Sequence, residues 1–302
     1  MKGAVLQSLA ANDIPYRENL ALHTVCTLRV GGIADLGIYP KSEEELLLTV
    51  SILNRERVPF EVIGRGSNLF FGDGRFSGAL ILTERMTAIR GEGERIFAQC
   101  GATLAALANY AAEQSLCGLE FARGIPGSLG GAVFMNAGAY GSSMEGVVAS
   151  TRAMNRKTGE VFTLTDHGFG YRKSVYMENP LWICLGAELV LRRGKREEIL
   201  SKMAQLSQKR RDSQPLEFPS AGSYFKRPEG YFAGKLIEDA GLKGRSVGGA
   251  EIAEKHAGFL INRGGATARD VLALEELVRD EVKERFGVVL EREVRYLPTA
   301  EG

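Results

Sequence analysis

The 302-residue chain contains few of the residues that bind metals or form disulfides. Its four cysteines, at positions 26, 100, 117 and 184, include no CxxC pair, and its three histidines are far apart and show no HExxH spacing. We expect the scattered thiols to be buried and reduced, as in the cytoplasm. We also expect no metal site, because closely spaced Cys or His ligands are missing.

Long apolar runs and an excess of one charge are also absent. Lys and Arg number 38 and Asp and Glu 37, so the net charge of +1 provides no overall field that would attract nucleic acid or an anionic membrane. No apolar run approaches membrane-spanning length, and residues 1–12 lack the layout of a signal peptide. We therefore expect a cytoplasmic protein without nucleic-acid, membrane or obligate protein partners.

Two motifs of common enzyme classes are missing as well. The absence of GxxxxGK[ST] argues against a P-loop NTPase. The absence of GxSxG argues against a hydrolase with a serine at a nucleophile elbow.

Glycine, by contrast, is concentrated in two ordered segments. Residues 123–141 contain six glycines together with apolar residues at 133–135, and Gly64-Arg65-Gly66-Ser67-Asn68 follows an apolar run at 60–63. Glycine is costly in regular structure, so these backbones are expected to bend sharply or to approach a ligand closely. Free peptide N–H groups in such turns bind phosphate oxygens. For the first loop alone, a tight structural turn is an equally good interpretation, but the pair predicts one extended phosphate-bearing ligand.

Hydrophobic periodicity predicts helices and strands along the whole chain. Helices are expected after the N-cap residues Ser42, Thr103 and Thr267 and across 195–211, and Gly287 is expected to end the last one. The first and last of the capped helices have an acidic residue three positions on, which is typical of a capping box. Short strands are expected at 60–63, 79–82, 95–98, 147–149, 161–164, 182–185 and 189–191, and a final strand at 288–295. Domain boundaries are expected near residues 80 and 200.

Three polar residues are candidates for chemistry, and each has a simpler interpretation. Ser223 is either a turn serine or a proton donor beside two cations. Arg172, after Tyr171, is either a surface cation or a bidentate ligand of a carboxylate. Glu293 alternates with apolar residues and by default faces solvent. The residue pattern alone predicts a ligand the size of a dinucleotide and leaves the chemistry open.

Ordered motifs over the full length resemble those of the UDP-N-acetylenolpyruvoylglucosamine reductase family (UDP-N-acetylmuramate dehydrogenase, MurB) of bacterial peptidoglycan synthesis. They are Thr27-Leu28-Arg29-Val30-Gly31-Gly32, Gly64-x-Gly66-Ser67-Asn68-Leu69, Gly124-Ile125-Pro126-Gly127, Met135 to Gly141, Tyr171-Arg172, Pro219 to Ser223, Phe232 to Ile237, His256-Ala257-Gly258-Phe259 and Glu291 to Arg295. The short interval from Arg172 to Ser223 resembles the branch without an inserted tyrosine loop. Cys26, Ile33 and Gly265 differ from the residues frequent in the family, which concerns local loop geometry.

The resemblance implies an α+β fold with a two-part FAD-binding module of the vanillyl-alcohol-oxidase type and a C-terminal α+β substrate-binding domain. The expected parts are 1–80, 81–200 and 201–302, with a last strand that can return to the first part. The resemblance also implies that NADPH reduces FAD, which then transfers hydride to C3 of UDP-N-acetylglucosamine enolpyruvate. The product, UDP-N-acetylmuramate, is a peptidoglycan precursor, which links the protein to cell wall biogenesis, cell shape and cell division.

The family's residue roles transfer to matching positions of this chain. Ser223 is expected to protonate C2, while Arg172 and Glu293 polarise the substrate carboxylate and stabilise the developing charge. The residues assigned to FAD are Gly64, Arg65, Gly66, Ser67, Asn68, Leu69, Ile125, Pro126, Gly127, Ser128, Gly130, Gly131, Asn136, Ala137, Gly138 and Gly141. The residues assigned to the substrate are Tyr171, Arg211, Lys226, Arg227 and His256.

Two other functions remain as alternatives. An alcohol or lactone oxidase or dehydrogenase could use the same flavin module. Many such oxidases attach FAD covalently through histidine, and because neither glycine segment contains one, we expect noncovalent FAD and favour the reductase. A non-catalytic nucleotide-binding protein is the third possibility, and it would carry no flavin.

Overall fold

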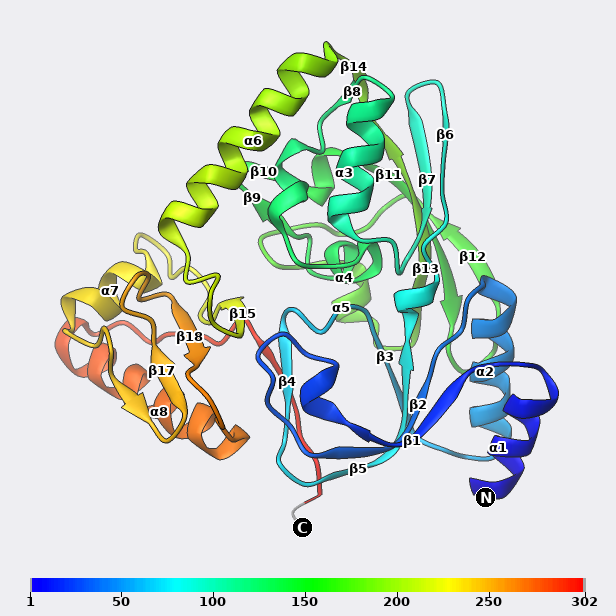
Figure 1. The fold of residues 1–302 in the computed structure, drawn as a ribbon, viewed down its shortest axis with the longest axis horizontal. Coiled ribbons are helices and arrows are strands. Elements are labelled where there is room, and N and C mark those ends of the chain that lie inside the picture. The colour runs from blue at the N-terminus through cyan, green and yellow to red at the C-terminus, as the bar shows by residue number, and fades with distance from the viewer. Residues whose placement is uncertain (1, 301–302) are drawn as a thin grey trace. The chain divides into compact units, whose positions relative to one another are not determined.

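The computed structural model describes residues 2–300, which form two compact units (Figure 1). The first unit comprises the chain up to Arg17, Leu36–Arg65 and Gly78–Lys209. The second comprises Glu18–Asp35, Gly66–Ser77 and the chain from Arg210 onward. This division differs from the expected boundaries at 80 and 200, because two short N-terminal segments belong to the same unit as the C-terminal residues.

The first unit contains a five-stranded antiparallel sheet of order β12-β11-β13-β7-β6. Its strands are β6 (Ile89–Glu92), β7 (Arg95–Gln99), β11 (Val148–Asn155), β12 (Val161–Leu164) and β13 (Trp182–Val190). Helices α3 (Leu104–Glu113) and α4 (Leu129–Phe134) lie beside this sheet (Figure 1), and their apolar residues share one buried cluster with β7 and β13. Leu129, Ala132 and Val133 of the second glycine segment are therefore packed into this core.

A second core in this unit lies around two helices near the N-terminus. Helices α1 (Lys2–Ala11) and α2 (Glu43–Arg55) pack together, and their apolar side chains contact β3 (Phe60–Ile63) and β5 (Arg75–Leu82). Strands β3 and β5 are parallel, in a sheet of order β1-β2-β5-β3 with β1 (Tyr16–Ala21) and β2 (Ile33–Ile38). The first glycine loop begins directly after β3.

The second unit contains a four-stranded antiparallel sheet of order β15-β18-β17-β16. Its strands are β15 (Ser220–Ser223), β16 (Ser246–Val247), β17 (Ala250–Ile252) and β18 (Phe259–Asn262). Helices α7 (Ala233–Asp239) and α8 (Ala268–Phe286) pack with this sheet in one apolar cluster. The last strand, β19 (Arg295–Leu297), pairs in parallel with β4 (Leu69–Phe71), which lies in the expected first part of the chain.

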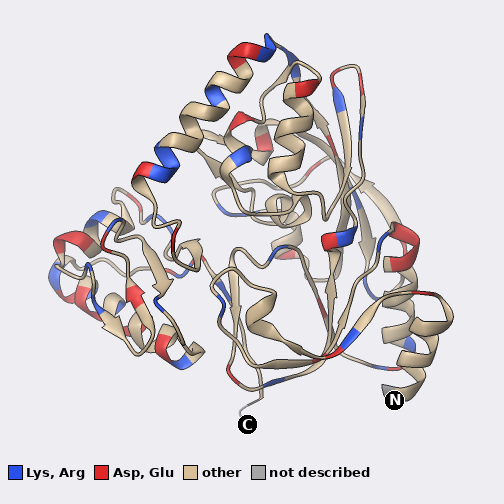
Figure 2. Ribbon diagram, in the orientation of Figure 1, with Lys and Arg blue, Asp and Glu red and all other residues tan. Residues whose placement is uncertain are grey.

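Of the remaining elements that the structure describes, α6 (Arg196–Ser213) is a long helix and the others are short. The short ones are η1 (Leu22–Thr24), η2 (Thr83–Arg85), β8 (Leu116–Cys117), η3 (Glu120–Gly124), β9 (Gly138–Ala139), β10 (Ser142–Ser143), η4 (Met144–Gly146), α5 (Val175–Glu178) and β14 (Arg192–Arg193). Within residues 2–300, no helix has the length and apolar character needed to cross a bilayer. Basic and acidic residues both occur along α6 and α8 (Figure 2). The mixture of helices and mainly antiparallel sheets confirms the α+β class.

Local capping signals placed the helix ends correctly. Thr103 caps α3 through Ala106 N, and Thr267 and Asp270 form both bonds of a capping box at α8. Gly287 ends α8 in the left-handed conformation, with φ of 68°. At α2 the Ser42 hydroxyl accepts from the N–H three residues on, as expected, but the Glu45 carboxylate accepts from Lys41 N rather than from the N-cap.

Two strand predictions were wrong. The separate strands expected at 182–185 and 189–191 form the single strand β13, which continues through Gly186, where a Cβ would lie 2.6 Å from Ala98 O on β7. The final strand begins at Arg295 rather than 288. Residues 291–293 instead hydrogen-bond to residues 224–226, a pairing that local periodicity cannot reveal.

Candidate functional site

The two glycine segments meet at Gly64 and Ser128. Gly64 follows β3, and Ser128 is the N-cap of α4. A Cβ added at Gly64 would overlap Ser128 Oγ and would lie 3.4 Å from Ser128 Cβ. Any side chain at position 64 would therefore displace the serine, which explains the need for glycine here.

Ser128 has a buried hydroxyl that lacks a partner. The residue is 1% exposed, its side chain makes no N-cap bond, and Oγ has no hydrogen-bond partner within the described part of the chain. Leaving a buried hydroxyl unpaired costs about 1–3 kcal/mol. A Cβ on Gly131, which is exposed, would lie 3.6 Å from this oxygen, so the hydroxyl is close to the surface. A phosphate oxygen supplied by a ligand would satisfy it, and the residues present therefore fit a phosphate-bearing cofactor.

Other glycines of the two segments are required by contacts within the protein. A Cβ at Gly66, where φ is 60°, would overlap Val25 O, and one at Gly130 would lie 2.9 Å from Cys100 Cβ. The N–H groups of Gly127 and Gly130 already donate to Ile125 O and Cys100 O. The structural-turn interpretation thus accounts for these positions, and their assignment to the cofactor stays a prediction.

Asn136 also bonds to the protein through its side chain. It is 4% exposed, with φ of 42°, and its amide donates to Gly170 O at 2.9 Å while its Oδ1 accepts from Glu145 N at 3.0 Å. The side chain therefore connects the second glycine segment to the turn that carries Arg172.

The predicted site residues differ in exposure. Gly66, Leu69, Ser128 and Asn136 are buried. Gly64, Ser67, Asn68, Ile125, Gly127, Gly130, Ala137, Gly138, Arg172, Lys226, His256 and Glu293 are half-buried. Arg65, Pro126, Gly131, Gly141, Tyr171, Arg211, Ser223 and Arg227 are exposed.

Arg172 lies in a strained turn of the first unit. Its φ is 53°, a left-handed conformation that costs a non-glycine residue about 1–2 kcal/mol. Gly170 and Lys173 exchange backbone hydrogen bonds of 3.2 Å across the turn. The Arg172 guanidinium carbon is 5.2 Å from the centroid of the Tyr171 ring. Strain held in place by surrounding bonds motivates a functional hypothesis for the strained residue.

Buried polar groups hold the segment on both sides of this turn. Ser174 Oγ donates to Phe134 O at 2.7 Å, and Thr151 Oγ1 lies 3.1 Å from His167 Nε2 and 2.7 Å from the Tyr176 hydroxyl. Burial lowers the pKa of His167 and raises the pKa of Tyr176, so both are neutral at pH 7. The turn is therefore anchored to β11 and to the end of α4.

Ser223 and Glu293 belong to the second unit, on segments that pair with each other. Ser223 ends β15 and pairs with Phe259 of β18. Glu293 N donates to Tyr224 O at 2.9 Å, and the Asn68 amide donates to Glu293 O at 3.2 Å. The structure thus brings together the backbones that carry these two candidates, while Arg172 belongs to the other unit.

The basic candidates for substrate binding contact other protein groups. Lys226 Nζ is 3.1 Å from Glu291 Oε2, and the Arg227 guanidinium carbon is 4.0 Å from the centroid of the Phe232 ring. His256 Nδ1 accepts from the N–H two residues on, and burial lowers the pKa of this histidine. At Arg211 the backbone carbonyl accepts from Lys255 Nζ. Their substrate roles stay predictions.

One polar residue of the second unit was missed by the sequence interpretation. Glu275 is 6% exposed on α8, where it interrupts the apolar series formed by Val271, Leu274, Val278 and Val282. An acidic residue on the core-facing side of a helix is the signal that was available.

Comparison with known proteins identifies the two parts of the chain. The family model described as FAD binding domain matches residues 34–165, and the model for the C-terminal domain of UDP-N-acetylenolpyruvoylglucosamine reductase matches residues 214–297. The chain is 46% identical to the UDP-N-acetylenolpyruvoylglucosamine reductase of Caldanaerobacter subterraneus subsp. tengcongensis, over 95% of this chain and 94% of that protein. It is 44% identical to that of Clostridioides difficile, over 97% and 96%. The crystal structure of the enzyme (MurB) from Thermus caldophilus superposes with a TM-score of 0.81 at 34% identity, covering 94% of this chain and all of that one.

Proposed function

The chain belongs to the UDP-N-acetylenolpyruvoylglucosamine reductase family, and on that premise we propose that it reduces UDP-N-acetylglucosamine enolpyruvate to UDP-N-acetylmuramate with NADPH and FAD. The product is a precursor of peptidoglycan. The observation that carries the proposal is the presence of both family regions in one chain that matches its relatives over nearly their whole length. An oxidase on the same flavin module is not favoured, because the C-terminal region also matches the reductase.

The loop at Gly64 and the hydroxyl of Ser128 would hold the phosphate portion of FAD. The absence of a side chain at 64 and the unpartnered Oγ at 128 support this assignment. When bound, the flavin accepts hydride from NADPH and supplies it to the substrate. Noncovalent attachment is proposed because neither glycine segment contains histidine.

Three side chains of this protein are proposed to act on the enolpyruvyl group. Ser223, which is exposed at the end of β15, donates the proton to C2. Arg172, on its anchored turn, binds the carboxylate, and a planar guanidinium matches that group with two parallel hydrogen bonds. Glu293 assists in polarising the carboxylate. We also propose a cytoplasmic location, which the four free cysteines support.

The proposal is tested with the purified protein under anaerobic conditions. NADPH should bleach the flavin absorbance, and UDP-N-acetylglucosamine enolpyruvate added to the reduced protein should restore it. Acid precipitation should leave the flavin in the supernatant. A colourless protein would support a non-catalytic function. A coloured acid pellet, with reduction by an alcohol or lactone in place of NADPH, would support the oxidase.

A further inference from the structure

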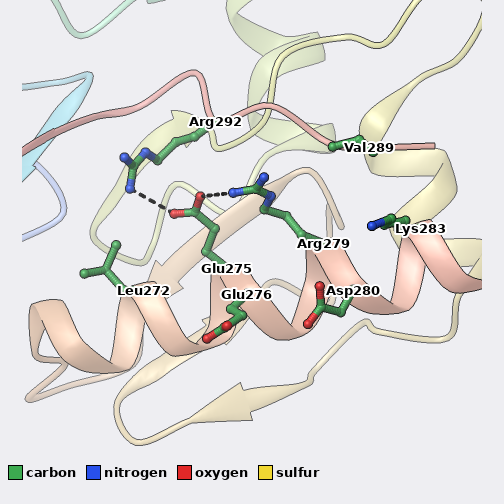
Figure 3. A pocket seen from close by; sticks show the side chains of 8 residues that line it. All are labelled: Leu272, Glu275, Glu276, Arg279, Asp280, Lys283, Val289 and Arg292. Carbon is green, nitrogen blue, oxygen red and sulfur yellow. Dashed lines mark hydrogen bonds and ion pairs between the residues drawn. The ribbon is translucent and has the colours of Figure 1, made fainter. Parts of the chain in front are cut away.

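Glu275 is a buried carboxylate that joins three side chains of the second unit. Tyr224 OH donates to its Oε2 at 2.9 Å, and Arg292 Nη1 lies 3.0 Å from the same oxygen. Arg279 Nη1 lies 3.6 Å from Oε1. Figure 3 shows the Glu275 side chain pointing away from the axis of α8 toward the two arginines, which approach it from different elements. The carboxylate is therefore shared between its own helix and two other segments of the chain.

The surroundings of Tyr224 and Glu275 determine which of them carries the proton. Burial, and then the Glu275 carboxylate, raise the pKa of Tyr224, so its phenol keeps the proton that it donates. The buried carboxylate in turn needs its cationic partners, because an isolated charge in a protein interior is strongly destabilising. Glu275, Tyr224 and the two arginines consequently form one connected network.

Two of the partners are chain neighbours of the proposed catalytic residues. Tyr224 follows Ser223, and Arg292 precedes Glu293. The two segments also pair directly through an isolated bridge between Phe225 and Arg292. Glu275 therefore holds, from one helix, both segments that carry the proposed proton donor and the proposed acid.

Stability alone does not explain a carboxylate at this position. The other core-facing residues of α8 are apolar, and replacing a buried ion pair by apolar groups of similar volume is often neutral or stabilising. A charged network retained in such a place fixes geometry, since its hydrogen bonds have preferred directions that apolar contacts lack.

We propose that Glu275 is a positioning residue, which acts through Tyr224 and Arg292 to hold Ser223 and Glu293 in the arrangement needed for reduction of the substrate. This inference rests on the proposed function. It assigns Glu275 a role in the oxidative half-reaction, in which the flavin is reoxidised by the enolpyruvyl substrate, and no role in reduction by NADPH.

The test compares Glu275→Gln with Glu276→Gln, a matched control on the adjacent, exposed position of the same helix. Both half-reactions are followed by rapid mixing and expressed per bound flavin. Glu275→Gln should leave reduction by NADPH within about twofold and slow reoxidation by up to about 100-fold, the loss that a misplacement near 1 Å can cause. The control should match wild type in both. Equal slowing of both half-reactions, or no slowing, would overturn the positioning role.

A second variant keeps the proposal testable if Glu275→Gln folds poorly. Tyr224→Phe deletes only the hydroxyl that Glu275 binds and should slow reoxidation selectively, by less than Glu275→Gln. Unchanged reoxidation in this variant would exclude action through Tyr224.

The double variant Ser223→Ala with Glu275→Gln separates this inference from the proposed function. Because Glu275 is proposed to hold Glu293 as well as Ser223, Glu275→Gln should still slow reoxidation in the Ser223→Ala background, but by a smaller factor than in wild type. Fully multiplicative effects would overturn the positioning of Ser223 by Glu275 and leave the function of Ser223 intact. If Ser223→Ala alone did not slow reoxidation, the proposed role of Ser223 would fail, and its positioning by Glu275 would fail with it.

Discussion

Removing the Ser128 hydroxyl should affect the free and the flavin-bound protein in opposite directions. In the free protein Oγ is buried and has no partner among residues 2–300, so it contributes an unpaired-group penalty of about 1–3 kcal/mol. Ser128→Ala deletes that oxygen and leaves Cβ in place. We expect the free energy of unfolding of the apoprotein to rise by about 1 kcal/mol, which corresponds to roughly 2 °C in Tm for a chain of this size.

FAD binding should weaken in the same variant. A hydrogen bond from a hydroxyl to an anionic phosphate contributes about 1.5–3 kcal/mol, so the Kd for FAD should increase by about 10- to 150-fold. Apoprotein prepared by acid treatment and refolding can be titrated with FAD by fluorescence quenching, and thermal unfolding can be followed with and without FAD. Higher stability of the apoprotein together with weaker binding of FAD is the diagnostic result.

Ser174→Ala is the matched control for the stability measurement. Its hydroxyl is also in a buried residue, but it donates to Phe134 O at 2.7 Å, so its removal should lower rather than raise apoprotein stability. If Ser128→Ala destabilised the apoprotein as Ser174→Ala does, the hydroxyl would have a partner within the protein, and the argument for a phosphate partner would be refuted.

Gly64→Ala provides an independent measure of the same contact. The new Cβ would overlap Ser128 Oγ, and overpacking of this kind costs about 1–3 kcal/mol. The double variant with Ser128→Ala removes the overlapping atom and leaves a Cβ–Cβ distance of 3.4 Å, so it should recover most of that loss. If the changes in the free energy of unfolding were instead additive in the double variant, the two loops would not be in contact at these atoms.

Three further predictions concern the catalytic groups and the buried histidine. Ser223→Ala should leave reduction by NADPH near normal and slow reoxidation by about 100- to 10,000-fold, the usual contribution of a general acid, whereas equal slowing of both steps would assign it a role in shaping the site. Arg172→Gly should slow reoxidation strongly yet stabilise the protein by up to about 1 kcal/mol, because glycine adopts φ of 53° without the strain of about 1–2 kcal/mol, and this gain exceeds its entropic cost of about 0.5–1 kcal/mol; a loss of stability in denaturant titrations would contradict this. Burial lowers the pKa of His167 below 6.5, so the unfolded chain binds the proton first and stability should fall as the pH drops below about 6.5, by up to about 1.4 kcal/mol per pH unit. His167→Gln should reduce that slope in denaturant titrations between pH 6.5 and 5.5, and an unchanged slope would exclude His167 as its source.

Local sequence patterns predicted much of the secondary structure, because their causes are local. An N-cap hydroxyl bonds to an N–H three residues on, so Thr103 and Thr267 could be recognised without knowledge of the fold. The strand at Val161–Leu164 was predicted to the residue. By contrast, the end of the chain was misjudged, since residues 291–293 obtain their hydrogen bonds from residues almost seventy positions earlier.

The candidate site could be predicted only in part, for the same reason. Glycine-rich loops indicated a ligand, but they did not reveal that Gly66 is required by Val25 O. Nor did they reveal that the Asn136 side chain bonds to the turn of Arg172. A glycine that fits against another backbone and one that fits against a ligand have the same local sequence.

The sequence by itself determined which residues could cap helices, which faces were apolar and, through ordered motifs along the full length, the family to which the chain belongs. Only the tertiary structure decided that Gly64 and Ser128 touch and that Glu275 joins the segments of Ser223 and Glu293. Capping and periodicity depend on neighbours within about four positions, whereas these contacts join residues 17 to 64 positions apart, whose proximity depends on how the whole core packs.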